Sequence, residues 1–180
     1  MEIYQPSEDS YFLTEILKKQ IPLLLQSDSN LTFLEIGAGS GIHLETAYNS
    51  GIKKENIISC DINPSSVSHC NALGFKCIHS DLFENISGKF DIIIFNPPYL
   101  PEHKFDSEND TSGGKKGDEI ILRFLKNARN YLNETGRIFL LLSSKTPMEN
   151  IKKEFKNYHV SLLGNEHLFY EELCVYELTQ

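Results

Sequence analysis

Apolar residues recur along the chain with two different spacings, and segments of the two kinds alternate. Apolar positions three and four residues apart predict helices over 8–21, 42–50, 64–73, 120–132 and 147–155. Short apolar runs predict strands over 31–36, 56–61, 75–79, 90–95, 137–142, 158–163 and 173–178. Strands that alternate with helices indicate an α/β fold with a mostly parallel sheet. The last two strands follow each other directly, which predicts an antiparallel hairpin at the sheet edge.

A polar segment over 101–117 interrupts this alternation between the fourth strand and the next helix. It contains three glycines and several acidic residues. Loops of this length are uncommon in compact domains unless they have a function. We therefore predict a long, mobile loop that becomes ordered only when a substrate or partner binds. The pattern as a whole predicts one domain over 1–180, with an N-terminal helical cap over 1–30 and a core over 31–180.

Composition argues against several classes of function. The chain has 180 residues and a formal net charge of −8 at pH 7, which argues against a free-standing binder of duplex DNA or RNA, because phosphate contacts need a basic surface. Four cysteines without a CxxC pair and six histidines without an HExxH pattern predict no metal site. The sequence contains neither a run of roughly 18 apolar residues nor a secretory signal, so we expect a cytoplasmic protein without a membrane span.

Three glycines lie between the first strand and the helix that follows it. Gly37, Gly39 and Gly41 are each two residues apart, whereas the third glycine of a dinucleotide-binding loop would fall one position later. Glycines here let a ligand approach the backbone, and N–H groups at the helix start then face that ligand. Glu35, directly before the loop, suits the amino group of a methionine moiety. Asp61, at the end of the second strand, can accept both hydroxyls of a ribose.

Asp81 and Leu82 follow the third predicted strand. The Asp81 carboxylate can accept a hydrogen bond from the exocyclic amine of adenine, while the backbone N–H of Leu82 donates to the ring. Taken alone, Asp81 fits a helix cap as well. If the glycine loop binds a cofactor, these two residues extend the predicted site to an adenine ring.

The residues Asn96-Pro97-Pro98-Tyr99 follow the apolar fourth strand, at the strand end where open α/β sheets bind ligands. An amide nitrogen is a poor nucleophile because its lone pair is delocalised into the carbonyl. The side-chain oxygen of Asn96 and the backbone carbonyl of Pro97 can accept both amide hydrogens. The prolines add no competing N–H, and Tyr99 offers a flat face to a planar group or a cation. Asn96, Pro97 and Tyr99 are therefore predicted catalytic residues, and all four are predicted to bind substrate.

Together these motifs resemble the HemK-type N-methyltransferases, above all their short archaeal and eukaryotic branch, the release-factor glutamine methyltransferases. The segments 4–10, 112–117 and 169–173 are also similar to that family. The resemblance implies a Rossmann-like class I methyltransferase fold, whose seven-stranded, mostly parallel sheet ends in an antiparallel hairpin and has helices on both faces. It implies S-adenosylmethionine as cofactor, with Ser10 and Asn96 in contact with it. Gln5 departs from the family, where an acidic residue is common.

The same resemblance implies a substrate and a partner. The substrate is the glutamine side chain in the Gly-Gly-Gln motif of a class I peptide-chain release factor. The partner is a small zinc-binding activator subunit that forms a heterodimer along the edge of the third strand, and Cys77 and Ile78 fit such an edge.

Other functions stay open at this point. A nucleic-acid N-methyltransferase acting on adenine or guanine can share the Asn-Pro-Pro-Tyr sequence, because exocyclic amines are also planar. The net charge and the lack of interleaved aromatic and basic residues argue against it. A cofactor-binding scaffold without activity would not need an intact 96–99 turn. The glycine spacing argues against a nicotinamide dehydrogenase.

Overall fold

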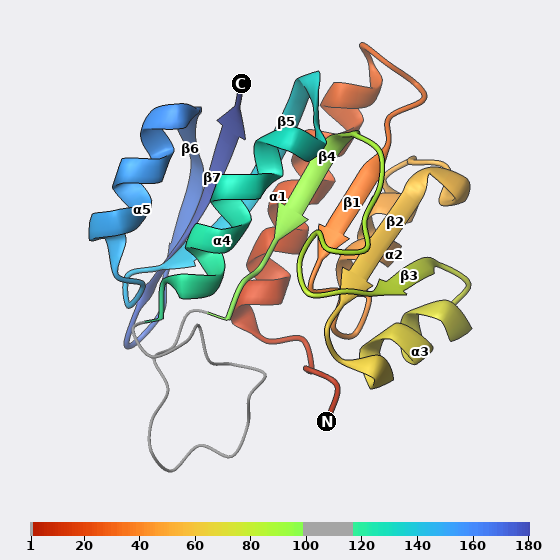
Figure 1. Cartoon of the computed structure of the whole chain (residues 1–180), viewed down its shortest axis with the longest axis horizontal. Coiled ribbons are helices and arrows are strands. Elements are labelled where there is room, and N and C mark those ends of the chain that lie inside the picture. Colours follow the sequence, from red (N-terminus) through yellow and green to blue (C-terminus); the bar gives the residue numbers. More distant parts are fainter. Residues whose placement is uncertain (1, 99–116) are drawn as a thin grey trace.

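The computed structural model describes residues 2–98 and 117–180 of the chain (Figure 1). The described elements, in chain order, are α1 (Glu8–Leu25), β1 (Phe33–Ile36), α2 (Ile42–Asn49), β2 (Ile57–Asp61), α3 (Pro64–Ala72), β3 (Lys76–His79), β4 (Phe90–Phe95), α4 (Glu119–Ala128), β5 (Leu132–Ser143), α5 (Met148–Glu154), β6 (His159–His167) and β7 (Glu172–Thr179). Short 3₁₀ turns precede β2, β5 and β6.

The seven strands form one sheet in the order β3-β2-β1-β4-β5-β7-β6. Strands β1 to β5 pair in parallel, and β7 pairs antiparallel with both β5 and β6. The predicted seven-stranded, mostly parallel sheet with a C-terminal hairpin is therefore confirmed. The chain leaves β1 toward β3 and then returns to the other side of β1 as β4. Such a reversal opens a crevice beyond the carboxyl ends of the two central strands, which is where α/β sheets bind ligands.

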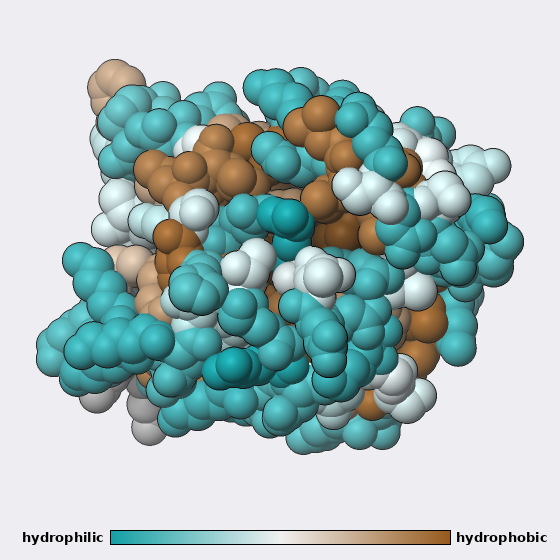
Figure 2. All heavy atoms as spheres, turned by 90° about the horizontal axis from the view of Figure 1, so that it is seen from above, coloured by the Kyte–Doolittle hydropathy of each residue, from teal (hydrophilic) through white to brown (hydrophobic). Residues whose placement is uncertain are grey.

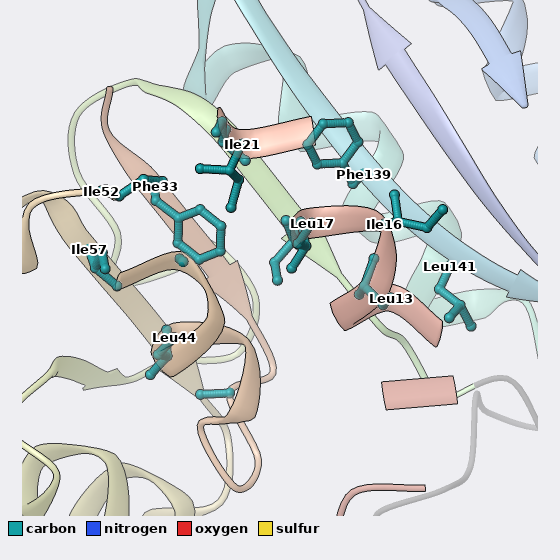
Figure 3. Packing of buried hydrophobic residues seen from close by; sticks show 14 of the residues in the cluster. Leu13, Ile16, Leu17, Ile21, Phe33, Leu44, Ile52, Ile57, Phe139 and Leu141 are labelled. Carbon is teal, nitrogen blue, oxygen red and sulfur yellow. The ribbon is translucent and has the colours of Figure 1, made fainter. Parts of the chain in front are cut away.

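Helix α1 covers one face of the sheet together with α2 and α3. Leu13, Leu17 and Ile21 follow each other at four-residue intervals and are fully buried. Figure 3 shows them beside Phe33 of β1 and Phe139 of β5, which belong to the same hydrophobic cluster. Burial of each such side chain contributes roughly 1.5–3 kcal/mol. The packing fixes α1 across the sheet and so places its first turn at the carboxyl ends of the strands.

Helices α4 and α5 cover the other face, where an aromatic group braces the end of β4. The Phe124 ring of α4 lies 4.7 Å from that of Phe95 and 5.5 Å from that of Phe83, measured between centroids. The Tyr131 ring stacks on the Phe83 ring, with 4.5 Å between the two centroids. Phe95 is the last residue of β4, so the rings hold the backbone directly before Asn96.

Several predicted boundaries were wrong. The sixth strand, for example, continues past residue 163 to His167. The first helix continues past residue 21 to Leu25 and contains Pro22, because Leu24 and Leu25 still pack on the core. The helix predicted to reach Leu132 ends at Ala128, and Leu132 instead begins β5, five residues before the predicted start. Leu132 pairs with Phe90, and a register shift follows in β4. β5 therefore begins with a residue whose apolar spacing also fits a helix.

Figure 2 looks onto the end of the molecule opposite the carboxyl ends of β1, β2 and β4, where hydrophobic atoms form a band among polar ones. In the described part of the chain, no helix is both long enough and apolar enough to cross a membrane. The division into a cap over 1–30 and a core over 31–180 stays a prediction.

Candidate functional site

A cavity of about 450 Å³ lies at the carboxyl ends of β1, β2 and β4. The predicted site residues that line it are Ser10, Glu35, Gly37, Gly39, Asp61, Asp81, Leu82, Asn96, Pro97 and Pro98. Gly41 is not part of the lining. Tyr99 lies outside the described residues, as does the predicted loop over 101–117 apart from its last residue. The structure thus brings together residues that are up to 88 positions apart in sequence, from Ser10 to Pro98.

The glycine loop has a backbone conformation that residues with a side chain rarely adopt. Gly37, Gly39 and Gly41 have φ angles of +72°, +50° and +80°, all in the left-handed region. The first two line the cavity, where a missing Cβ leaves the backbone open to a ligand. A Cβ on Gly41 would instead lie 3.3 Å from Cys70 Sγ on α3. The third glycine therefore lets α3 pack against the start of α2, and its predicted contact with the cofactor stays a prediction.

The carboxylate of Asp61 joins the glycine loop to the end of β2. Its Oδ2 accepts from the backbone N–H of Gly39 at 2.8 Å, and its Oδ1 accepts from that of Asn63 at 2.8 Å. Asp61 is thus held where it can accept two neighbouring hydroxyls, as the predicted ribose contact requires.

Glu35 forms a buried pair with His43, a residue that the sequence did not point to. Glu35 Oε1 lies 2.7 Å from His43 Nδ1, and His43 Nε2 lies 3.1 Å from the backbone oxygen of Ser10. Both ring nitrogens thus face oxygen acceptors, so the ring is satisfied best when both carry a proton. Burial raises the pKa of Glu35. Burial alone would lower the pKa of His43, but the Glu35 carboxylate, the backbone oxygen of Ser10 and the charge of Asp9 together outweigh it and raise that pKa above its usual value.

We expect the His43 ring to titrate at a lower pH in a Glu35→Gln variant than in the wild type. The neutral amide removes the attraction, and burial then favours the uncharged ring. In the wild type, the raised pKa of His43 stabilises the folded protein. This stabilisation is complete at pH values below the pKa in the unfolded chain, about 6.5, and is lost as the pH rises through the higher pKa in the folded protein. Ring-proton NMR shifts followed against pH measure this, with the exposed His159 as an internal control. Equal His43 midpoints in both proteins would contradict the assignment.

Asp81 and Leu82 lie in a turn after β3 rather than at the start of a helix, so Asp81 is not a helix cap. Leu82 has a φ of +50°, and within residues 2–98 and 117–180 no other non-glycine residue has a positive φ. Its backbone oxygen accepts from Ser80 Oγ at 3.0 Å, which helps to hold the strained turn. Arg123 of α4 donates to Asp81 Oδ2 at 2.9 Å. Among residues 2–98 and 117–180, no ion pair involves the other carboxylate oxygen of Asp81.

Asn96 presents an acceptor that has no partner. Its Nδ2 donates to Asp9 Oδ2 at 3.0 Å, while its buried Oδ1 has no hydrogen-bond partner. Glu35 Oε2 is also buried without a hydrogen-bond partner. In the described part of the chain, Thr14 Oγ1 is the third and last buried side-chain atom of this kind. A buried acceptor without a donor costs about 1–3 kcal/mol. Two of these three atoms belong to residues that line one cavity, which is the pattern of a site prepared for donors on ligands.

Asp9 and Tyr4 also line the cavity, although the sequence suggested no role for them. Asp9 follows the pattern of a solvated helix start, yet its side chain is only 6% exposed. No signal in the sequence marks His43, because its partners Glu35 and Ser10 are recognised only once the fold is known. Within the described residues, no group of three or more histidine, cysteine or acidic side chains is placed to hold a metal ion.

Comparison with known proteins relates this chain to methyltransferases. The family model described as "Methyltransferase small domain" matches residues 10–171. A "Putative protein N5-glutamine methyltransferase" from Methanocaldococcus jannaschii is 37% identical, with 97% of this chain and 90% of that protein covered. Methyltransferase HEMK2 of Mus musculus is 29% identical, over 86% of this chain and 78% of its own.

Among solved structures, the Mtq2–Trm112 complex of E. cuniculi contains a chain with the same fold. The TM-score is 0.79 at 21% identity, and the match covers 100% of this chain and 99% of that one. That complex is responsible for the methylation of the translation termination factor eRF1. The predicted Rossmann-like arrangement is thus confirmed by a match along the whole chain.

Proposed function

This chain belongs to the methyltransferase small-domain family, and we propose that it methylates the side-chain amide nitrogen of the glutamine in the Gly-Gly-Gln motif of a class I release factor. The likeness to HEMK2 and to the archaeal protein places it in the HemK-type branch that its motifs resemble. One observation carries the proposal: the buried Asn96 Oδ1, an acceptor without a partner, on a residue that lines the cavity at the end of β4. An amide N–H is the donor that this atom lacks.

The cavity fits S-adenosylmethionine, the cofactor of this reaction. A volume of about 450 Å³ lies in the range of small-molecule sites. Glu35 Oε2 has no partner and suits the cofactor's ammonium group, while Asp61 suits the ribose hydroxyls. Asp81 and the strained backbone at Leu82 suit the adenine ring. Bound there, the cofactor supplies an electrophilic methyl group on a positively charged sulfur.

The residues after β4 prepare the substrate nitrogen. Asn96 Oδ1 and the backbone carbonyl of Pro97 accept the two N–H hydrogens of the glutamine amide, which fixes the orientation of the nitrogen. Neither Pro97 nor Pro98 has an N–H that would compete for these acceptors. Orientation of this kind can supply roughly 7–11 kcal/mol of the barrier. No strong base is needed, because a methylated amide nitrogen loses its extra proton readily.

The edge of the sheet at β3 supports the proposed heterodimer. β3 ends the strand order, so one side of this four-residue strand has no neighbour among the described strands. A partner strand can pair with such an edge through its backbone. The similar E. cuniculi chain is found in complex with Trm112. We propose that a small zinc-binding activator covers β3 here and that the heterodimer acts in the cytoplasm, where release factors meet the ribosome.

A transfer assay with labelled S-adenosylmethionine tests the proposed function. The chain is produced together with the activator subunit and offered a release factor from the same source, with the Gly-Gly-Gln glutamine intact or replaced. Bulk RNA and DNA are the competing acceptors. We expect label on the intact release factor alone. Label on nucleic acid alone would instead establish the exocyclic-amine alternative, for which the Asn-Pro-Pro-Tyr sequence is equally suited.

A further inference from the structure

Asp9 lies buried between the first turn of α1 and the end of β4. Its Oδ2 accepts from Asn96 Nδ2 at 3.0 Å, and its Oδ1 accepts from the backbone N–H of Ser10 at 2.6 Å. The hydroxyl of Tyr4 donates to both oxygens, at 2.9 and 3.0 Å. Donors thus hold the carboxylate from several sides, and its orientation is set by the backbone of α1 and by Tyr4.

This contact decides which end of the Asn96 amide faces the substrate. A side-chain amide has an oxygen end and a nitrogen end of nearly the same shape, and a half-turn about its last bond exchanges them. An ionised carboxylate only accepts hydrogen bonds, so the amide nitrogen must face Asp9. The half-turn would bring the Asn96 oxygen against the Asp9 oxygen and would turn an NH₂ group toward the substrate, where an acceptor is required.

We propose that Asp9 is a positioning residue for methyl transfer, which keeps Asn96 Oδ1 directed at the substrate amide. The inference rests on the proposed function, because it assigns to Asp9 the role of orienting Asn96, the residue proposed to bind the substrate nitrogen. Tyr4 and the N–H of Ser10 support the same arrangement by holding Asp9 in place. The burial of Asp9 prevents water from competing for the contact with Asn96.

A donor–acceptor exchange between positions 9 and 96 separates this role from a structural one. Asp9→Asn allows the Asn96 amide to turn over, and Asn96→Asp sets two carboxylates against each other. In the double variant, the new amide at position 9 donates to the carboxylate at position 96. The pair then has its donor and acceptor exchanged, and an oxygen again faces the substrate. Ser10 N–H and Tyr4 can still donate to the remaining oxygen at position 9.

We expect kcat for methylation of the release factor to fall about 10- to 100-fold in each single variant, since a hydrogen bond to a charged group is lost. The dissociation constant for S-adenosylmethionine should change by no more than about threefold in Asp9→Asn, because orientation of the substrate is what the variant loses. The double variant should recover most of kcat. A merely structural role predicts that the two losses multiply, and that result, or a wild-type kcat in Asp9→Asn, would overturn the proposal.

A second measurement works without any methyl acceptor. The side-chain amide protons of Asn96, identified by their loss from the NMR spectrum of Asn96→Asp, should exchange with water at least about tenfold more slowly in the wild type than in Asp9→Ala. Equal exchange rates would overturn the positioning role even if the release factor is methylated. Protected amide protons in a protein that leaves the release factor unlabelled would refute the proposed substrate and leave the orientation of Asn96 intact.

Discussion

Replacing Asn96 by alanine is expected to lower kcat for methyl transfer by about two to three orders of magnitude, the range seen when one preorganised polar group is removed from an active site. The substitution deletes the buried Oδ1, which has no hydrogen-bond partner among the described residues. Without this acceptor the substrate amide can turn, and its nitrogen no longer faces the methyl group. The affinity for S-adenosylmethionine, measured by calorimetry, should change far less, because Glu35 and Asp61 lie elsewhere in the cavity.

Asn30→Ala is a matched control for this prediction. Asn30 is exposed and lies before β1, at the opposite end of the sheet from the cavity. Both variants lose a side-chain amide, but that of Asn30 is far from the cavity, where its oxygen accepts from Lys53 and Asn56. A kcat of Asn96→Ala within about threefold of that of Asn30→Ala would show that the orientation of the amide contributes little to the barrier.

Asp61→Ala is expected to weaken cofactor binding by about 100-fold or more, since hydrogen bonds to a charged group contribute about 1.5–3 kcal/mol each. The variant removes the acceptor for the ribose hydroxyls. It also releases the backbone N–H groups of Gly39 and Asn63, which the carboxylate holds at 2.8 Å. Saturating S-adenosylmethionine should restore much of kcat, whereas it should restore none in Asn96→Ala. Activity measured against the concentration of S-adenosylmethionine distinguishes the loss of cofactor binding in Asp61→Ala from the loss of kcat in Asn96→Ala.

Asp91→Ala serves as the control for Asp61→Ala. Asp91 also holds backbone in place, accepting from the N–H and hydroxyl of Thr32 at 2.8 and 2.7 Å and from Asn133, but it does so at the start of β4. Burial acts to raise the pKa of Asp91, yet these hydrogen bonds outweigh it and lower that pKa. At pH values above the ordinary carboxyl pKa, Asp91→Ala should be less stable than the wild type. Its affinity for S-adenosylmethionine should be unchanged. Similar cofactor affinities in both variants would exclude a ribose contact at Asp61.

The sequence predicts those parts of the site that local chemistry determines. The glycine loop and the Asn-Pro-Pro-Tyr turn each follow a buried strand, and their residue types restrict the backbone whatever lies around them. A parallel α/β sheet then brings strand ends together at one edge, so Glu35, Asp61 and Asn96 are predicted to be neighbours. The structure confirms that they line one cavity.

The rest of the site depends on contacts that no local pattern records. The hydrogen bond between Asp9 and Asn96 joins residues 87 positions apart, and its partners are defined by the packing of α1 across the sheet. His43 follows the glycine loop on the buried side of α2, where a histidine is unusual, but its meaning requires Glu35 and Ser10 in space. The early start of β5 depends on pairing of Leu132 with β4, which outweighs a helical spacing.

The central claim is that the acceptor is a glutamine side chain, and mass spectrometry of the methylated product tests it most directly. The release factor is incubated with the heterodimer and S-adenosylmethionine, digested, and fragmented to locate the added methyl group. We predict a single methyl group on the side-chain nitrogen of the Gly-Gly-Gln glutamine, and no such product from Asn96→Ala. A methyl group on another residue, or on nucleic acid with the release factor unmodified, would contradict the account.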